Sequence, residues 1–219
     1  MIPCDAAQAD ESILDTGVGV DPQSFLTNLN LYFKSAKAWL SVLQASYICF
    51  LLQPHHKNFR KRLVKTPKLY FYDLGLACRL LGIHEPGQIC THPLRGSLFE
   101  NMVVADALKE ISHLGLPASL YYWRNNTGLE IELLLDTGQT LYPMEIKSGQ
   151  TFASNWLDPM RKWKQLAQGD AGQPFLCFGG EGKGVRSGTM YLPWHDLGSI
   201  LPGTIQGEEG TGRLTNSDR

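Results

Sequence analysis

The stretch LEIELLLDTGQTLYPMEIK, residues 129–147, decides the fold, because two segments of alternating residues flank one turn. Successive side chains on a β-strand point to opposite faces. In the first segment Glu130 and Glu132 therefore point away from the apolar side chains, and in the second Glu145 and Lys147 do the same. This pattern predicts an antiparallel hairpin with an apolar core face and a polar face.

The turn at 136–139, Asp-Thr-Gly-Gln, suits a tight two-residue hairpin loop. With Thr and Gly at its tip, we expect Glu130 to lie directly opposite Glu145, with Glu132 and Lys147 as neighbours on the same face. Cross-strand partners are ~5 Å apart at Cβ. We therefore predict that three carboxylates converge within reach of one divalent ion.

Carboxylates this close repel each other, and burying them is costly unless a proton or a cation neutralises them. Mg²⁺ or Mn²⁺ suits such a site, because hard oxygen ligands bind hard cations. A metal held there would polarise a phosphodiester for attack by water, and Lys147 would orient that water or screen the phosphate. The alternative is that Glu130, Glu145 and Lys147 are simply the solvated face of an ordinary hairpin.

The elements around the hairpin predict an α/β fold. Apolar residues recur at helical spacing along 94–114, and Gly115 ends this segment, so we expect a long amphipathic helix that carries Glu100. The order α-β-β-β-α-β indicates a mixed sheet with helices on its faces. The other expected elements are a strand at 119–124, a helix around 156–166 and a strand at 174–180.

The N-terminal third shows a helix, a buried strand, a basic turn and a second strand, which is the order expected of a winged-helix unit at about 25–85. We expect a loose lead-in at 1–24, a helix capped by Ser35 and a strand at 47–53. The basic residues of the turn would contact phosphate or would only keep a hairpin soluble. Both interpretations stay open for Arg60, Lys61, Arg62 and Lys65.

Composition gives weaker guidance about function. The net charge of −1 over 219 residues provides no global field that attracts a polyanion. Five widely spread cysteines without zinc-like spacing favour a reducing cytoplasm. We expect neither export nor membrane insertion. The segment GGEGKG at 179–184 lacks the Ser or Thr and the helix of a phosphate-binding loop, so we expect no ATPase activity, and we expect a loose tail at 203–219.

Two residues precede the acidic hairpin. We interpret Trp123 as a core residue, whereas Arg124 is a candidate phosphate contact. The alternative for Arg124 is an ion pair with a neighbouring glutamate.

Four separated segments resemble a known family. They are similar to the uncharacterised C-terminal domain that accompanies predicted AAA+-type ATPases, a branch of the PD-(D/E)XK nuclease-like superfamily, and to the winged-helix-like segment before that domain. The resemblance covers about 28–151 and implies a restriction-endonuclease-like domain at about 91–195. The segments are KRLVKTPKLYFYDLGLACRLLGI (61–83), LRGSLFENMVV (94–104), YYWRNNTGLEIELLLD (121–136) and LYPMEIKSGQT (141–151).

The resemblance also implies roles for the acidic residues. Glu132 and Glu145 match the metal ligands, Lys147 the lysine, Glu100 the acid on the first helix, and Glu130 the acid before the metal ligand. Relatives usually have Asp where this chain has the longer Glu132. The implied function is DNA binding with Mg²⁺- or Mn²⁺-dependent phosphodiester hydrolysis. The competing hypothesis is a catalytically inactive interaction or DNA-binding module that docks on, or regulates, a partner ATPase.

Overall fold

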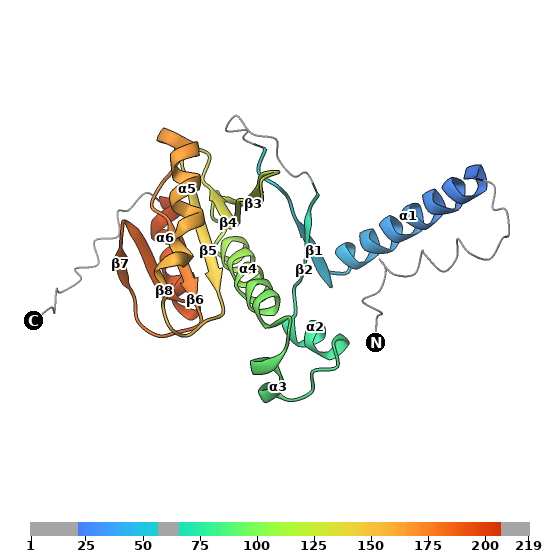
Figure 1. The fold of residues 1–219 in the computed structure, drawn as a ribbon, viewed down its shortest axis with the longest axis horizontal. Coiled ribbons are helices and arrows are strands. Elements are labelled where there is room, and N and C mark those ends of the chain that lie inside the picture. Colours follow the sequence, from blue (N-terminus) through green and yellow to red (C-terminus); the bar gives the residue numbers. More distant parts are fainter. Residues whose placement is uncertain (1–21, 57–65, 207–219) are drawn as a thin grey trace, which may run out of the picture.

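The computed structural model describes residues 22–56 and 66–206, which form a six-stranded sheet with helices on both faces and a small hairpin beside it (Figure 1). The helices are α1 (Pro22–Ala45), α2 (Leu74–Leu80), α3 (Pro86–Thr91), α4 (Arg95–Leu114), α5 (Asp158–Ala167) and α6 (Leu197–Gln206). The strands are β1 (Cys49–Leu52), β2 (Lys68–Phe71), β3 (Ser119–Arg124), β4 (Glu130–Asp136), β5 (Leu141–Lys147), β6 (Phe175–Phe178), β7 (Gly184–Arg186) and β8 (Thr189–Pro193).

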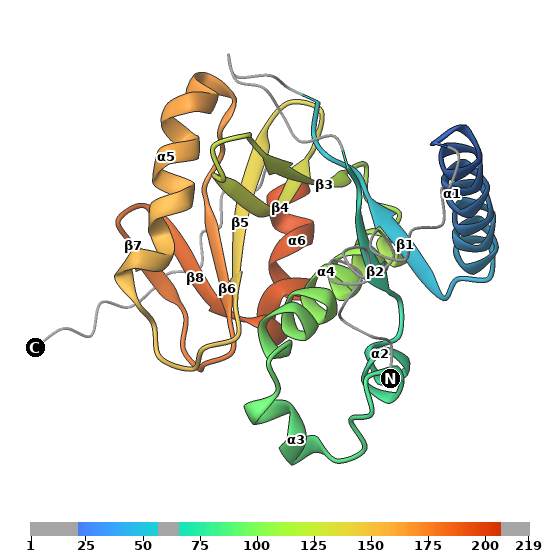
Figure 2. The same ribbon diagram turned by 45° about the vertical axis from the view of Figure 1, so that its right-hand side comes forward.

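The large sheet has the strand order β3-β4-β5-β6-β8-β7. Strands β3, β4 and β5 are antiparallel, β6 runs parallel to both β5 and β8, and β7 is antiparallel to β8. Figures 1 and 2 show α4 and α6 on one face of this sheet and α5 on the other. Two separate apolar clusters fill these two layers. The predicted mixed sheet flanked by helices is therefore confirmed.

Helix α4 is the central helix and occupies the segment predicted for it. Val103, Val104 and Ile111 are at most 6% exposed, and each buried side chain of this kind contributes about 1.5–3 kcal/mol. Gly115 follows the helix with φ 60°, a left-handed conformation that glycine adopts readily, and its N–H donates to the carbonyls of Ile111 and Ser112. This end of α4 therefore forms as the sequence indicates.

The hairpin of β1 and β2 packs against α4 and shares its core. Phe50, Leu52 and Tyr70 belong to the same apolar cluster as the buried face of α4. The side chain of Asn101 on α4 accepts a hydrogen bond from Phe71 N at 2.8 Å and donates one to Phe71 O at 2.8 Å. The hairpin is thus fastened to the helix by apolar packing and by a pair of polar contacts.

The N-terminal elements follow the predicted order, but two boundaries are wrong. Helix α1 begins at Pro22 rather than Ser35, because proline suits the first helical turn and apolar residues continue at helical spacing through 25–33. The loop predicted before α4 contains α3, which a capping box between Glu85 and Gln88 opens. The basic turn lies outside the described residues, as does 1–21 of the predicted lead-in.

Three C-terminal elements were not predicted. Strands β7 and β8 have three and five residues, which is too short for alternation to identify them. Helix α6 runs to Gln206 through Pro202, so the tail predicted from 203 begins inside a helix. Within the described ranges, no helix has the length and apolar character needed to cross a bilayer.

Candidate functional site

The turn between β4 and β5 has four residues, Thr137–Thr140, rather than the predicted two. Asp136 pairs with Leu141 as the last rung of the ladder. Asp136 Oδ1 accepts a hydrogen bond from Gly138 N at 2.7 Å, which folds the turn back on the strand end. Because this Asp side chain stabilises a longer turn, Asp136 pairs with Leu141. The predicted two-residue turn would have paired it with residue 139.

The longer turn changes which glutamates face each other. The predicted pairing of Glu130 with Glu145 is wrong. Leu133 pairs with Met144, and continuing this register by one residue places Glu132 opposite Glu145. A shift of two residues keeps each side chain on its own face of the sheet. The hairpin therefore keeps an acidic face, but Glu132 rather than Glu130 lies opposite Glu145 on it.

A β-bulge in β4 then separates the two glutamates of that strand. Tyr121 pairs with Leu134 but Trp123 pairs with Ile131, so β4 carries one extra residue between these rungs. Ile131 consequently packs with Leu134 in the cluster under α5, whereas Leu133 packs in the cluster under α4. The prediction that alternate residues of β4 all share one apolar face is wrong at this bulge.

One ammonium group bridges two carboxylates at the bulge. Lys147 Nζ lies 2.8 Å from Glu132 Oε1 and 2.6 Å from Glu145 Oε1. The backbone N–H of Ile146 donates to Glu132 Oε2, which fixes that side chain across the strands. Glu145 Oε2 is buried, and among the described residues it has no hydrogen-bond partner. A buried acceptor of this kind requires a proton, a water molecule or a cation.

Burial and crowding shape the ionisation of this group, which we call the Lys147 cluster (Glu132, Glu145 and Lys147). Burial, with the neighbouring carboxylate of Glu132, raises the pKa of Glu145 to about 8. Burial also raises the pKa of Glu132, although attraction to Lys147 opposes this change. Burial lowers the pKa of Lys147, but the two carboxylates outweigh it and raise that pKa overall. The single ammonium of Lys147 therefore pairs with both carboxylates. Because the pKa values of both carboxyl groups are still raised, they favour a proton or a further cation.

Glu100 and Glu130 belong to a different group, which we call the Lys68 cluster (Lys68, Tyr70, Glu100, Arg124 and Glu130). Lys68 Nζ of β2 lies 2.9 Å from Glu100 Oε1 and also contacts Glu130 Oε1. The Tyr70 hydroxyl donates to Glu100 Oε1 at 2.5 Å, and Arg124 Nε lies 3.6 Å from Glu130 Oε2. Arg124 thus forms the ion pair that was the alternative to phosphate contact.

The structure does not bring three carboxylates around one ion. Within residues 22–56 and 66–206, no group of three or more His, Cys, Asp or Glu side chains is arranged to hold a metal. Glu130 pairs with Lys68 instead, because the bulge turns it away from Glu132. The expectation of three converging carboxylates is therefore wrong, and a pair remains.

That pair still fits a hard divalent cation. Mg²⁺ in proteins is commonly held by one or two carboxylates, with substrate phosphates and water completing the shell. Glu132 and Glu145 supply two carboxylates, and the buried Oε2 atom of Glu145 is an acceptor that no described group uses. These residues would hold Mg²⁺ or Mn²⁺ in a site that substrate completes.

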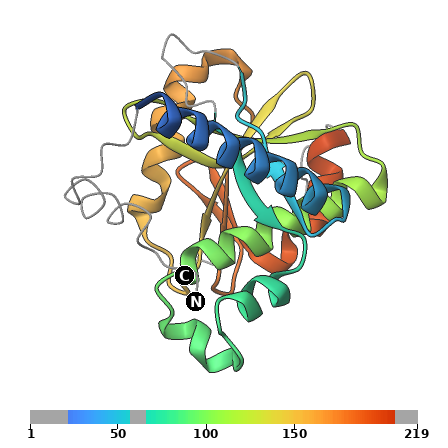
Figure 3. The same cartoon turned by 90° about the vertical axis from the view of Figure 1, so that its right-hand side faces the viewer.

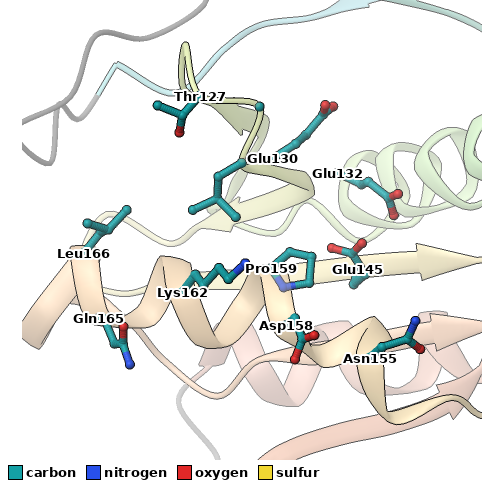
Figure 4. Close-up of a pocket in the computed structure, with 12 residues that line it drawn as sticks. Thr127, Glu130, Glu132, Glu145, Asn155, Asp158, Pro159, Lys162, Gln165 and Leu166 are labelled. Carbon is teal, nitrogen blue, oxygen red and sulfur yellow. The ribbon is translucent and has the colours of Figure 1, made fainter.

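Glu130, Glu132 and Glu145 line a cavity of about 680 Å³ between β4, β5 and α5 (Figure 4). Its opposite wall includes Asn155, Asp158 and Lys162, from α5 and the turn before it. These three residues were not predicted to belong to the site. The signal was present, because Asp158, Lys162 and Gln165 recur at the spacing of one helix face.

The remaining predicted contacts divide into two sets. Trp123 is fully buried and packs edge-to-face with Trp163, with ring centroids 6.5 Å apart, so its interpretation as core is confirmed. The basic residues of the turn between β1 and β2 that were proposed for phosphate contact lie outside the described residues, and their role stays a prediction. They are Arg60, Lys61, Arg62 and Lys65.

Two parts of the chain match known protein families. Residues 95–197 match the family described as "Domain of unknown function (DUF4143)", which is usually found in ATPase-associated proteins. Residues 20–87 match the family described as "Domain of unknown function (DUF8612)". The sheet domain thus matches a family of the kind that the resemblance implied, whereas the nuclease-like and winged-helix-like parts of the resemblance and the association of this chain with an ATPase stay predictions.

Curated relatives are longer than this chain. "Uncharacterized protein Mb2031c" of Mycobacterium bovis and "Uncharacterized protein Rv2008c" of Mycobacterium tuberculosis are each 32% identical to it over 124 residues. The aligned region is 57% of this chain but 27% of each relative, so the chain matches about a quarter of their length. No solved structure matches the chain.

Proposed function

We propose that the protein binds DNA and hydrolyses its phosphodiester bonds with Mg²⁺ or Mn²⁺. The observation that carries this proposal is the Lys147 cluster, in which Lys147 bridges the buried Glu145 and the partly buried Glu132, and both carboxylates line a cavity. Two carboxylates that share one ammonium are a costly arrangement for stability alone. Groups with strongly shifted pKa values in a cavity are characteristic of reactive sites.

The residues of the cluster have separate roles in this proposal. Glu132 and Glu145 would hold the metal, which when bound polarises the phosphodiester and stabilises the charge formed as water attacks phosphorus. Lys147 would hold the attacking water or the phosphate oxygens, since its ammonium already lies between the carboxylates. Water adds to phosphorus, the P–O bond to the leaving sugar breaks, and that sugar oxygen takes a proton.

The Lys68 cluster would assist without reacting. Glu130 lines the same cavity, but its carboxylate is held by Lys68 and Arg124. Glu100 is held by Lys68 and Tyr70. We propose that both contribute negative charge near the metal and keep β2 in place beside the site.

The test is cleavage of supercoiled plasmid and of single-stranded DNA by the purified chain, with Mg²⁺, Mn²⁺ or EDTA. We expect metal-dependent cutting that Lys147→Ala abolishes. Lys164→Ala is a matched control, because Lys164 is an exposed residue of α5 that does not line the cavity. Absence of cutting with either metal, or equal cutting by Lys147→Ala, would contradict hydrolysis.

A second proposal is that the chain is an inactive module that docks on a partner ATPase. Helix α1 favours it, because Trp39, Val42 and Tyr47, at the helix and just after it, are 73%, 62% and 76% exposed. Figure 1 shows α1 standing apart from the large sheet, and in Figure 3, where that side faces the viewer, α1 runs across the front of the molecule. The family association with ATPases supports the same idea. Mn²⁺ titration calorimetry distinguishes the two proposals, since a docking module needs no metal at Glu145.

A further inference from the structure

The reactive end of the cavity is deep. The side chains of Glu145 and Glu132 are only 4% and 17% exposed, although both line the cavity. A phosphodiester must therefore descend into the cavity to reach them. In a duplex each phosphate is tied to stacked bases and a second strand, whereas an unpaired strand can bend so that one of its phosphates enters a recess.

The other end of the cavity differs in chemistry from the acidic end. Leu129 and Leu166 line the cavity with apolar side chains, and Thr127 and Gln165 line it with neutral hydrogen-bonding groups. In Figure 4 Thr127 and Leu166 lie at the end away from Glu132 and Glu145. A nucleobase has two apolar faces and a polar edge, and pockets for it combine these same two kinds of contact. The cavity thus has an acidic end suited to metal and phosphate, and a neutral end suited to a base.

Lys162 lies between the two ends and differs from the other lysines of the region. In Figure 4 its side chain extends from α5 into the cavity. Lys147 and Lys68 are each held by two carboxylates, whereas no described residue forms an ion pair or hydrogen bond with Lys162. A free ammonium beside carboxylates that favour a metal is placed to bind the phosphate that such a metal would also contact.

We infer that the cavity accepts an unpaired segment of a DNA strand, with Lys162 binding the phosphate that follows the nucleotide held in the neutral end. This inference deepens the proposed function and rests on it. Single-strand sites combine a cation that follows the backbone with a surface that contacts the base. The protein therefore selects single-stranded DNA or frayed ends over intact duplex.

The test compares a fluorescein-labelled single strand of 12 nucleotides with a hairpin duplex that contains the same sequence. Binding to the full chain is measured by anisotropy in Ca²⁺, and cleavage of both DNAs is measured in Mn²⁺. The variant is Lys162→Gln, and the matched control is Lys164→Gln, an exposed lysine of α5 outside the cavity lining. The parent and the two variants share all other basic residues, so those residues contribute equally to DNA binding in each protein.

We expect the single strand to bind at least tenfold more tightly than the duplex and to be the DNA that is cut. Lys162→Gln should weaken single-strand binding by roughly five- to tenfold near 50 mM salt and reduce the slope of log affinity against log salt by about 0.7, as loss of one phosphate contact predicts. Lys164→Gln should leave the affinity and slope nearly unchanged.

Three outcomes separate this inference from the proposed hydrolysis. Equal binding and cutting of duplex and single strand would overturn the inference while leaving hydrolysis intact. Selective single-strand binding that depends on Lys162, without cutting in any metal, would support the inference and overturn hydrolysis. Failure to bind the single strand, or equal effects of Lys162→Gln and Lys164→Gln, would overturn the inference.

Discussion

Two lysines of this protein each hold two glutamates, with different consequences. In the Lys68 cluster, Lys68 is joined by the Tyr70 hydroxyl and the Arg124 guanidinium, so three donors serve Glu100 and Glu130. In the Lys147 cluster a single ammonium joins two carboxylates, and Glu145 Oε2 is left without a hydrogen-bond partner among the described groups.

The two clusters therefore differ in role. The Lys68 cluster holds elements of the fold together, whereas the Lys147 cluster is the candidate reactive site. The Lys68 cluster connects β2 to α4 and β4, and its charges are compensated by donors within the protein. The Lys147 cluster is more deeply buried and keeps an acceptor unused, which is costly for stability unless a ligand completes it. Similar residue types therefore perform different tasks according to how many donors surround them.

The largest expected effect separates the two clusters by activity. We expect Glu145→Gln to reduce Mn²⁺-dependent cleavage by roughly 10³-fold, because loss of one charged ligand removes most of the stabilisation of the transition state. Glu130→Gln should reduce it less than about tenfold, since Glu130 is held by Lys68. The measurement is initial rate under saturating DNA. Equal losses in the two variants would remove the distinction between the clusters.

Stability should depend most on the polar contacts that accompany the Lys68 cluster. Asn101→Ala leaves both the N–H and the carbonyl of Phe71 without their side-chain partner, at a cost of about 2–3 kcal/mol. Asn101→Asp retains the acceptor for Phe71 N but places a carboxylate oxygen against the Phe71 carbonyl, so it should lose at least as much. Urea unfolding measures both variants. A change below about 0.5 kcal/mol for Asn101→Ala would contradict this role.

The pH dependence of stability reports on the Lys147 cluster. The folded-state pKa of Glu145 is raised to about 8, above its ordinary value of 4.5. Protonation therefore favours the folded state, and the stability that this group contributes is fully present below pH 4.5 and is lost as pH rises through 8. Glu145→Gln keeps a neutral group there and should become more stable relative to the parent as pH rises.

The gain for Glu145→Gln between pH 5 and pH 9 should be roughly 2 kcal/mol, less than the full shift because the variant also loses its ionic contact with Lys147. Urea unfolding in EDTA measures this difference at each pH. Glu181→Gln is a matched control, because its side chain is 87% exposed. A parent-minus-variant difference that stays flat with pH would contradict the assignment.

The smallest expected effect concerns Lys68 itself. Lys68→Met should lower stability by about 1 kcal/mol, because the ion pairs it loses are 21–25% exposed and are partly screened by water. Tyr70 and Arg124 continue to satisfy the two glutamates. Thermal unfolding at low and high salt measures the change. A loss of stability as large as that of Asn101→Ala would show that Lys68, rather than Asn101, contributes most to holding β2 against α4.

Much of the fold was predictable because its signals are local. The helical spacing along α4 and its terminal Gly115 gave the correct boundaries, and alternation gave strands β3, β4 and β5. Helix α1 and the short strands β7 and β8 were misjudged or missed. The start of α1 had local signals in Pro22 and the apolar spacing that follows it, whereas β7 and β8 are too short to show a period.

The candidate site was predictable in membership but not in pairing. Glu132, Glu145 and Lys147 do meet, as the polar faces of two adjacent strands require. The assignment of Glu130 failed because a one-residue bulge in β4 and a four-residue turn leave no mark in the alternation. Lys162 was missed because its spacing with Asp158 and Gln165 marks one face of α5 but does not indicate which strands that face meets.

The most direct test of the Lys147 cluster is anomalous X-ray diffraction from crystals grown with Mn²⁺. We predict a manganese peak within coordination distance of carboxylate oxygens from both Glu132 and Glu145, and no such peak in Glu145→Gln. A map in which Lys147 bridges both carboxylates and no manganese binds at saturating metal would contradict the metal centre.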